Sequence, residues 1–89
     1  MTTDPLAHLR GQFRKKAHED AAALRLAWGQ GAQGLPQVEH LAHSLAGAAG
    51  IFGYVEIGAA ALTVDARFAA GETPGEAEVA ALLAAIDRI

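Results

Sequence analysis

The 89-residue chain has no cysteine, which excludes disulfides, thiolate catalysis and the usual structural zinc sites. It also lacks any apolar run of about 18 residues or more, the length that a membrane-spanning helix needs. The first residues carry neither the basic start nor the apolar run of a secretory signal. We therefore expect a cytoplasmic protein without membrane association, whose stability comes from packing alone.

Positive charge and aromatic residues are also scarce. Lys and Arg number seven against ten Asp and Glu, and aromatic residues make up 6% of the chain. The one cationic cluster comprises Arg10, Arg14, Lys15 and Lys16. It is too small, and has too few aromatics around it, to indicate a nucleic-acid surface. An acidic protein partner fits it better.

What the chain does have is helical periodicity. Asp4 followed by Pro5 predicts a helix start, and apolar residues then recur at three- and four-residue spacing to about Trp28. The glycine-rich residues 29–34 predict a loop, and Pro36 suits the first turn of a second helix that ends at Gly53. The apolar residues expected inside the first helix are Leu6, Leu9, Phe13, Ala17, Ala21, Leu24 and Trp28.

A third helix is expected from residue 54 or 55 to residue 70. It has two apolar lines and should be buried on two sides. Thr73 and Glu76 predict a capping box for a fourth helix. The first line of the third helix is Val55, Ala59, Leu62, Ala66 and Ala69, and the second is Ile57, Ala61, Val64 and Phe68. The inner residues expected of the fourth helix are Val79, Leu82, Leu83, Ile86 and Ile89.

Four amphipathic helices with short connections favour an all-α fold, an antiparallel up-and-down four-helix bundle. At this length we expect a single domain over residues 1–89, and a monomer. The abundance of alanine at core positions indicates closely spaced helices without room for a large internal cofactor.

The segment from Val38 to Gly53 is the most informative part of the chain. On a helical wheel its core-facing residues fall within roughly 100° of one another, and His43 points about 170° from their centre. Glycine inside a helix costs roughly 0.5 to 1 kcal/mol relative to alanine, yet Gly47 and Gly50 both share the histidine's face. We expect His43 to be exposed, and another molecule to approach the helix backbone beside it closely. The predicted core residues are Val38, Leu41, Leu45, Ala48, Ala49 and Phe52.

This segment resembles the histidine phosphotransfer (HPt) domains of bacterial multistep phosphorelays, whose motif has the form H-x-L-K-G-x-x-x-x-x-G. Here it reads His43, Ser44, Leu45, Ala46, Gly47 and then Gly53. The helix order also fits, so the resemblance covers nearly the whole chain. It implies a phosphocarrier of two-component signal transduction rather than a conventional enzyme. His43 would exchange a phosphoryl group with aspartates of receiver domains, in response regulators or hybrid histidine kinases, and magnesium would belong only to the receiver.

One residue departs from the motif. Ala46 stands where many relatives have a lysine near the phosphoryl oxygens. We therefore expect either that the phosphohistidine is stabilised by other groups, such as His40 or the basic cluster, or that the phosphorylated state is short-lived. For partner docking we expect clearance at Ala46, Gly47 and Gly50. The remaining docking candidates are His40, Ile51, Lys15 and Lys16.

Three alternatives stay open. His43 could be an ordinary surface histidine in a chain rich in glycine and alanine. The domain could be a degenerate member that binds a receiver or kinase without being phosphorylated, or the substrate domain of a chemotaxis-type kinase, although such domains are usually fused to the kinase and this chain ends at Ile89. His40 and His43, three residues apart, supply only two metal ligands, so no metal site is predicted.

Overall fold

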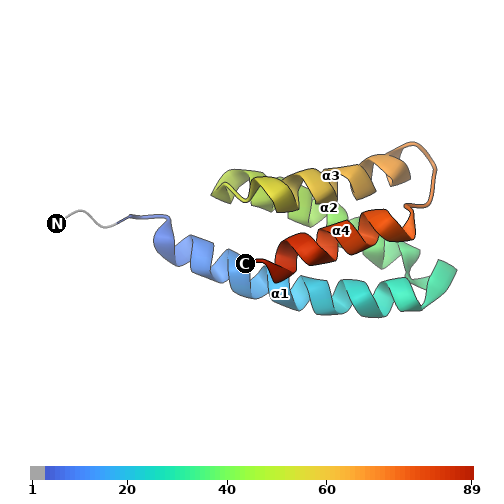
Figure 1. The fold of residues 1–89 in the computed structure, drawn as a ribbon, viewed down its shortest axis with the longest axis horizontal. Coiled ribbons are helices and arrows are strands. Elements are labelled where there is room, and N and C mark those ends of the chain that lie inside the picture. Colours follow the sequence, from blue (N-terminus) through green and yellow to red (C-terminus); the bar gives the residue numbers. More distant parts are fainter. Residues whose placement is uncertain (1–3) are drawn as a thin grey trace.

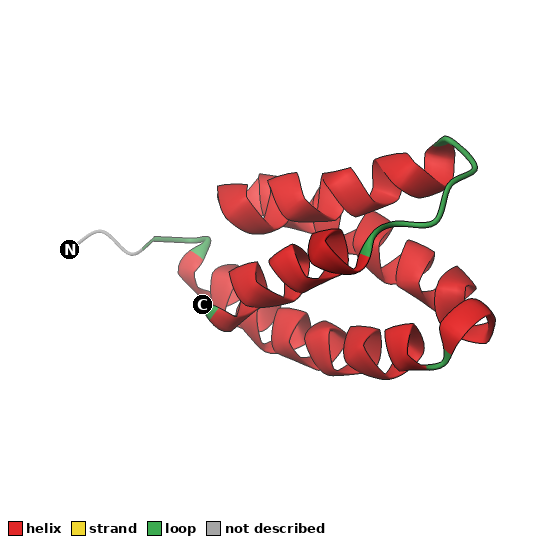
Figure 2. Ribbon diagram, turned by 45° about the vertical axis from the view of Figure 1, so that its right-hand side comes forward, coloured by secondary structure: helices red, strands yellow, loops and turns green. Residues whose placement is uncertain are grey.

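The structure is a computed structural model, and it describes residues 4–89. Residues 1–3 of the expected domain lie outside the described part. The described residues form helices joined by short connections and contain no strand (Figures 1 and 2). No helix in it is long and apolar enough to cross a lipid bilayer. The elements are α1 (Ala7–Gly29), a 3-10 turn η1 (Gly31–Gly34), α2 (Leu35–Phe52), α3 (Val55–Ala69) and α4 (Glu76–Asp87).

The helices form a bundle in which each packs on its neighbours in the sequence, and α4 packs back on α1. Figure 1 shows the chain reversing its direction at each of the three connections between α-helices. The core between them is made almost entirely of aliphatic side chains, with Phe13 as its one buried aromatic residue. Phe13 stacks on Tyr54 at 5.0 Å between ring centroids and lies 5.6 Å from Phe52.

The beginning of α1 differs from the prediction. The helix starts at Ala7, although the Asp4 side chain still accepts a hydrogen bond from the amide of Leu6 at 2.9 Å. Leu6 and Leu9, expected inside, are exposed, because the first turns of α1 extend past the other helices (Figure 1). Burial begins at Phe13.

The predicted loop after α1 contains the short turn η1, which ends in a close contact. A Cβ added at Gly34 would lie 1.8 Å from the carbonyl oxygen of Ala27, so only glycine fits this approach of the chain to α1. Pro36 lies in the first turn of α2, as predicted. Gly53 ends α2 with φ of +81°, in the left-handed region that favours glycine.

In α2 the predicted inward residues Val38, Leu41, Leu45 and Ala49 are buried. Ala48 and Phe52 are half-buried at the edge of the core. Ala42, which the wheel did not single out, is fully buried as well. The core face of this helix is therefore centred slightly closer to α3 than the sequence predicts.

The prediction for α3 is wrong on one side. Ile57, Ala61 and Val64 of the second line are buried and Phe68 is half-buried. Every member of the first line is exposed, because no helix covers that side. An apolar line of α3 thus faces outward.

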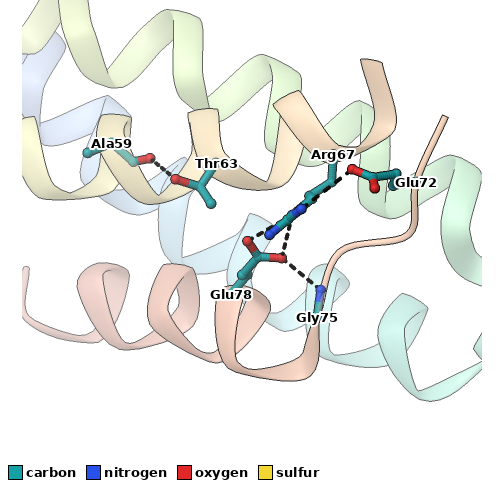
Figure 3. Close-up of polar contacts among 6 residues, drawn as sticks. All are labelled: Ala59, Thr63, Arg67, Glu72, Gly75 and Glu78. Carbon is teal, nitrogen blue, oxygen red and sulfur yellow. Dashed lines mark hydrogen bonds and ion pairs between the residues drawn. The ribbon is translucent and has the colours of Figure 1, made fainter. Parts of the chain in front are cut away.

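The connection between α3 and α4, the longest non-helical stretch after residue 6 (Figure 2), is held by polar contacts. The expected box of Thr73 and Glu76 is wrong: the N-cap is Gly75, whose amide donates to Glu78 at 2.8 Å. Arg67 of α3 reaches both Glu78, at 3.1 Å, and Glu72, at 3.4 Å (Figure 3). The Gly75 amide first, and then Arg67, hold the pKa of Glu78 below its ordinary value.

Inside the bundle, α4 follows the prediction in its main residues. Val79, Leu82 and Ile86 are buried, while Leu83 and Ile89 are half-buried. Gly71 ends the preceding helical turn with φ of +77°.

Candidate phosphoryl-transfer site

His43 lies in the middle of α2 with 77% of its side chain exposed. The neighbours two residues away on either side, Leu41 and Leu45, are buried in the core. The predicted outward direction of the histidine is therefore confirmed, and its ring is accessible to another protein.

The ring has one polar partner in the described part of the chain, which is Asp65 of α3. Nδ1 of His43 lies 3.3 Å from Oδ2 of Asp65, and the Asp65 side chain is only 24% exposed. A carboxylate accepts hydrogen bonds, so a neutral ring bonded to Asp65 would carry its proton on Nδ1 and keep the lone pair on Nε2. The free lone pair then belongs to the nitrogen that is not engaged with α3.

Sequence analysis did not single out Asp65, because its position depends on how α2 and α3 pair. A Cβ at Gly58 would lie 3.8 Å from Ala49 and 3.9 Å from the amide of Gly50, so the helices meet there. His43 precedes Gly50 by seven residues and Asp65 follows Gly58 by seven. Seven residues are about two helical turns, which brings both side chains to the same level. The small residues on both sides of the turn at Gly53 were the one sign in the sequence that α2 and α3 pack closely there.

The glycines beside His43 make no close internal contact. A Cβ added at Gly47 or Gly50 would meet nothing within 4 Å. Packing among residues 4–89 therefore gives no reason for glycine at either position. This is the arrangement expected where an outside molecule approaches the helix closely.

A shallow hollow begins one turn from His43, between α2 and α3. We call it the α2–α3 groove, and apart from the Tyr54 hydroxyl its side chains are apolar or absent. Val55 is 77% exposed and Leu62 is 59% exposed. The groove is lined by Ala46, Gly50, Tyr54, Val55, Gly58, Ala59 and Leu62.

The other predicted docking residues lie outside this groove. His40 and Ile51 are exposed on α2, about 60° and 80° around the helix from His43. Lys15 is exposed on α1, and Lys16 pairs with Asp20 at 3.0 Å. No contact brings these four residues to the His43 ring within residues 4–89, and their docking role stays a prediction.

The rest of the cationic cluster also has partners within the chain. Arg10 pairs with Asp4, and Arg14 donates to the carbonyl of Ile89 at 2.8 Å. Ala46 is half-buried at the edge of the groove and supplies no charge. In residues 4–89, no lysine or arginine is found in contact with the His43 ring.

A second hollow lies on the other side of the histidine. It is lined in part by Glu39, which precedes His43 by about one helical turn, and by Glu72. Carboxylates thus occupy one end of the line between α2 and α3, and apolar side chains occupy the other. Across residues 4–89, no three His, Asp or Glu side chains gather in a way that would hold a metal ion.

The comparisons with known proteins agree with the resemblance seen in the sequence. The family model described as the Hpt domain matches residues 8–89. No curated protein and no solved structure matches the chain.

Proposed function

The chain belongs to the Hpt domain family, which places it in phosphorelay signalling, and from this premise we propose that His43 is the residue that carries the phosphoryl group. The observation that supports this most directly is the exposed ring whose Nδ1 faces Asp65, a contact that would leave the lone pair of a neutral ring on Nε2. Hpt domains are phosphocarriers that work with receiver domains and kinases. His43 would both accept from and donate to receiver aspartates.

The chemistry follows from the ring's two nitrogens. The Nε2 lone pair attacks the phosphorus of a receiver's aspartyl phosphate, and an N–P bond forms as the P–O bond to the aspartate breaks. The receiver recovers its carboxylate. Nδ1 keeps its proton throughout, and the positive charge that the ring acquires is balanced by the carboxylate of Asp65. Donation to a second receiver reverses these steps.

In this proposal the chain supplies only the nucleophile and its orientation. Magnesium and most of the charge stabilisation would be held by the receiver domain, and this chain would need no cofactor or metal of its own. The proposal treats residues 1–89 as one antiparallel up-and-down domain. It would act as a monomer in the cytoplasm of a bacterium, within a two-component system.

A second candidate is a degenerate module that binds a receiver or kinase without being phosphorylated. Ala46 favours it, because a lysine there would bring a cation to the phosphoryl oxygens. The Asp65 contact weighs against it, since an orienting carboxylate serves no purpose on an unreactive ring.

The deciding experiment uses receiver domains encoded in the same genome, each phosphorylated with acetyl phosphate and magnesium. We expect acid-labile label to appear on the wild-type chain and to be lost completely in His43→Gln. The matched control is His18→Gln, which removes an exposed imidazole on α1 and should leave the label. Label that persists in His43→Gln, or no label on the wild type from any receiver, would reject the carrier role.

A further inference from the structure

The charged groups found beside His43 are carboxylates. Asp65 contacts the ring at 3.3 Å, and Glu39 precedes His43 by four residues on α2. Four residues turn an α-helix by about 40° beyond one full turn, so Glu39 shares the outward face of His43. Glu39 is exposed, and it lines a hollow together with Glu72, on the side of α2 that faces α3. A group attached to the ring is therefore added next to negative charge.

The cations of the chain are committed elsewhere. All seven lysines and arginines fall within residues 4–89, and six of them make hydrogen bonds to groups other than His43. Arg67, which follows α3 past the level of the ring, turns towards α4 and bonds Glu78 (Figure 3). The seventh cation, Lys15, is exposed on α1. The six bonded cations are Arg10, Arg14, Lys16, Arg25, Arg67 and Arg88.

Phosphorylation of His43 would bring two opposite charges to this position. The ring gains a positive charge, which the Asp65 carboxylate balances through Nδ1. The phosphoryl oxygens bring close to two negative charges at neutral pH, and none of the cations described above contacts this position. Glu39, on the same face, repels the phosphoryl oxygens. The repulsion raises the free energy of the phosphorylated state relative to the free histidine.

A receiver aspartate has the opposite surroundings, because its phosphoryl group lies beside the magnesium ion that the receiver holds. In donation the N–P bond at Nε2 breaks, and a P–O bond to the receiver's carboxylate forms. The electron pair of the N–P bond returns to Nε2, and Nδ1 keeps its proton. The phosphoryl group thereby moves from a negative surface to a positive ion.

We propose that His43 is a transient donor: at equilibrium with a receiver, the phosphoryl group resides on the receiver's aspartate, and Glu39 helps to set this balance. The chain then relays phosphoryl groups without storing them. Transfer into His43 is the uphill step, so net flow needs an upstream receiver that an ATP-dependent kinase keeps phosphorylated. This assignment rests on the proposed function of His43.

The test measures where the phosphoryl group resides at equilibrium. The chain is first phosphorylated at His43 with phosphoramidate, a small donor, and is then mixed with magnesium and an equal amount of a receiver that exchanges label with it. The readout is the ratio of phosphohistidine to aspartyl phosphate, taken before the aspartyl phosphate hydrolyses. When little complex is present, this ratio does not depend on where or how fast the receiver docks. Urea unfolding of each variant checks its fold.

Two variants bring a cation to the ring from different positions. Glu39→Lys reverses the charge about one turn before His43, and Ala46→Lys adds a charge about one turn after it. Ala46→Lys shows how large a shift a cation beside the ring can cause. The matched control is Glu19→Lys, an exposed glutamate on α1 whose reversal changes the net charge by the same amount as Glu39→Lys.

In the wild type we expect the receiver to hold the phosphoryl group in an excess of about fivefold or more. Glu39→Lys and Ala46→Lys should each raise the ratio of phosphohistidine to aspartyl phosphate by about threefold to tenfold, because a cation now attracts the phosphoryl oxygens. Glu19→Lys should stay within about twofold of wild type. Added salt should shift the wild-type ratio towards His43 more than the Glu39→Lys ratio, because salt screens the repulsion.

Two results would overturn the transient-donor assignment and leave the carrier role intact. One is a wild-type ratio in which most of the phosphoryl group stays on His43. The other is a ratio in Glu39→Lys that equals the ratio in Glu19→Lys. If every receiver fails both to label the wild type and to take the group from phosphorylated His43, the carrier role itself is rejected.

Discussion

The two lines of α3 consist entirely of apolar residues but differ in burial. Ile57, Ala61 and Val64 are buried, whereas Val55 and Leu62, on the same helix, are exposed. Apolar character alone therefore does not decide burial; the presence of a covering helix does. The difference divides α3 into a side that holds the bundle together and a side that is available to a partner.

The two boundaries of α3 differ in the same way. Towards α4 it is joined by Arg67 and Glu78, and by the Glu56–Arg88 ion pair at 2.7 Å. Towards α2 the corresponding polar contact is the one between His43 and Asp65. Polar groups on the α4 side pair with one another, while the α2 side keeps an exposed imidazole and open apolar surface.

The largest effect expected from this comparison concerns stability. Ile57→Ala removes a side chain that is 1% exposed and should lower the free energy of unfolding by about 2 to 5 kcal/mol, because it leaves a cavity. Leu62→Ala, five residues further on, should change it by less than about 0.5 kcal/mol. Urea unfolding of both variants measures the difference, and similar losses would show that the outer line is covered in solution.

The next effect concerns reactivity. Asp65→Ala should slow phosphoryl transfer from a receiver to His43 by roughly tenfold, because the ring loses both its orientation and the balance of the positive charge that it acquires on accepting the group. Asp65→Asn keeps a hydrogen-bond acceptor without the charge and should fall between Ala and wild type. Single-turnover rates at several pH values separate the two contributions. Wild-type rates in Asp65→Ala would mean that the contact with His43 has no part in transfer.

The smallest expected effects come from substituting Gly47 and Gly50, which should raise the stability of the fold but slow phosphoryl transfer. Gly47→Ala and Gly50→Ala should each stabilise α2 by roughly 0.5 to 1 kcal/mol, since a Cβ at either position meets nothing within 4 Å in the described residues beyond the helix's own backbone. The same changes should slow transfer from a receiver if a partner approaches the helix there. Gly53→Ala is the contrasting control and should destabilise, because its φ is +81°. If the variants are stabilised and transfer phosphoryl groups at the wild-type rate, the two glycines have no part in docking a partner.

Much of this arrangement is readable from the sequence. The ends of α2 and α3 at Gly53 and Gly71, and the outward direction of His43, depend on local conformation and spacing within one helix. The exposure of Val55 and Leu62 cannot be predicted in the same way. Spacing predicts which residues share a face of a helix, but not which face is covered by a neighbouring helix.

Contacts between helices are the other feature that the sequence does not predict. Asp65 becomes a partner of His43 only through the pairing of α2 with α3 around Gly58 and Gly50. Likewise the sequence pattern predicted Thr73 as the N-cap of α4, whereas the structure has Gly75, where Glu78 reaches the Gly75 amide and Arg67 together (Figure 3). Sequence patterns within one segment do not contain that information.

The pairing of His43 and Asp65 across two helices also ties reactivity to the folded state. A chain in which α3 is unfolded, or has slipped by one residue against α2, carries a histidine with no carboxylate beside it. Newly made or damaged copies would then be poor acceptors and would not drain phosphoryl groups from the pathway. If His43 carries the phosphoryl group as proposed, the contact makes correct folding a condition for taking part in signalling.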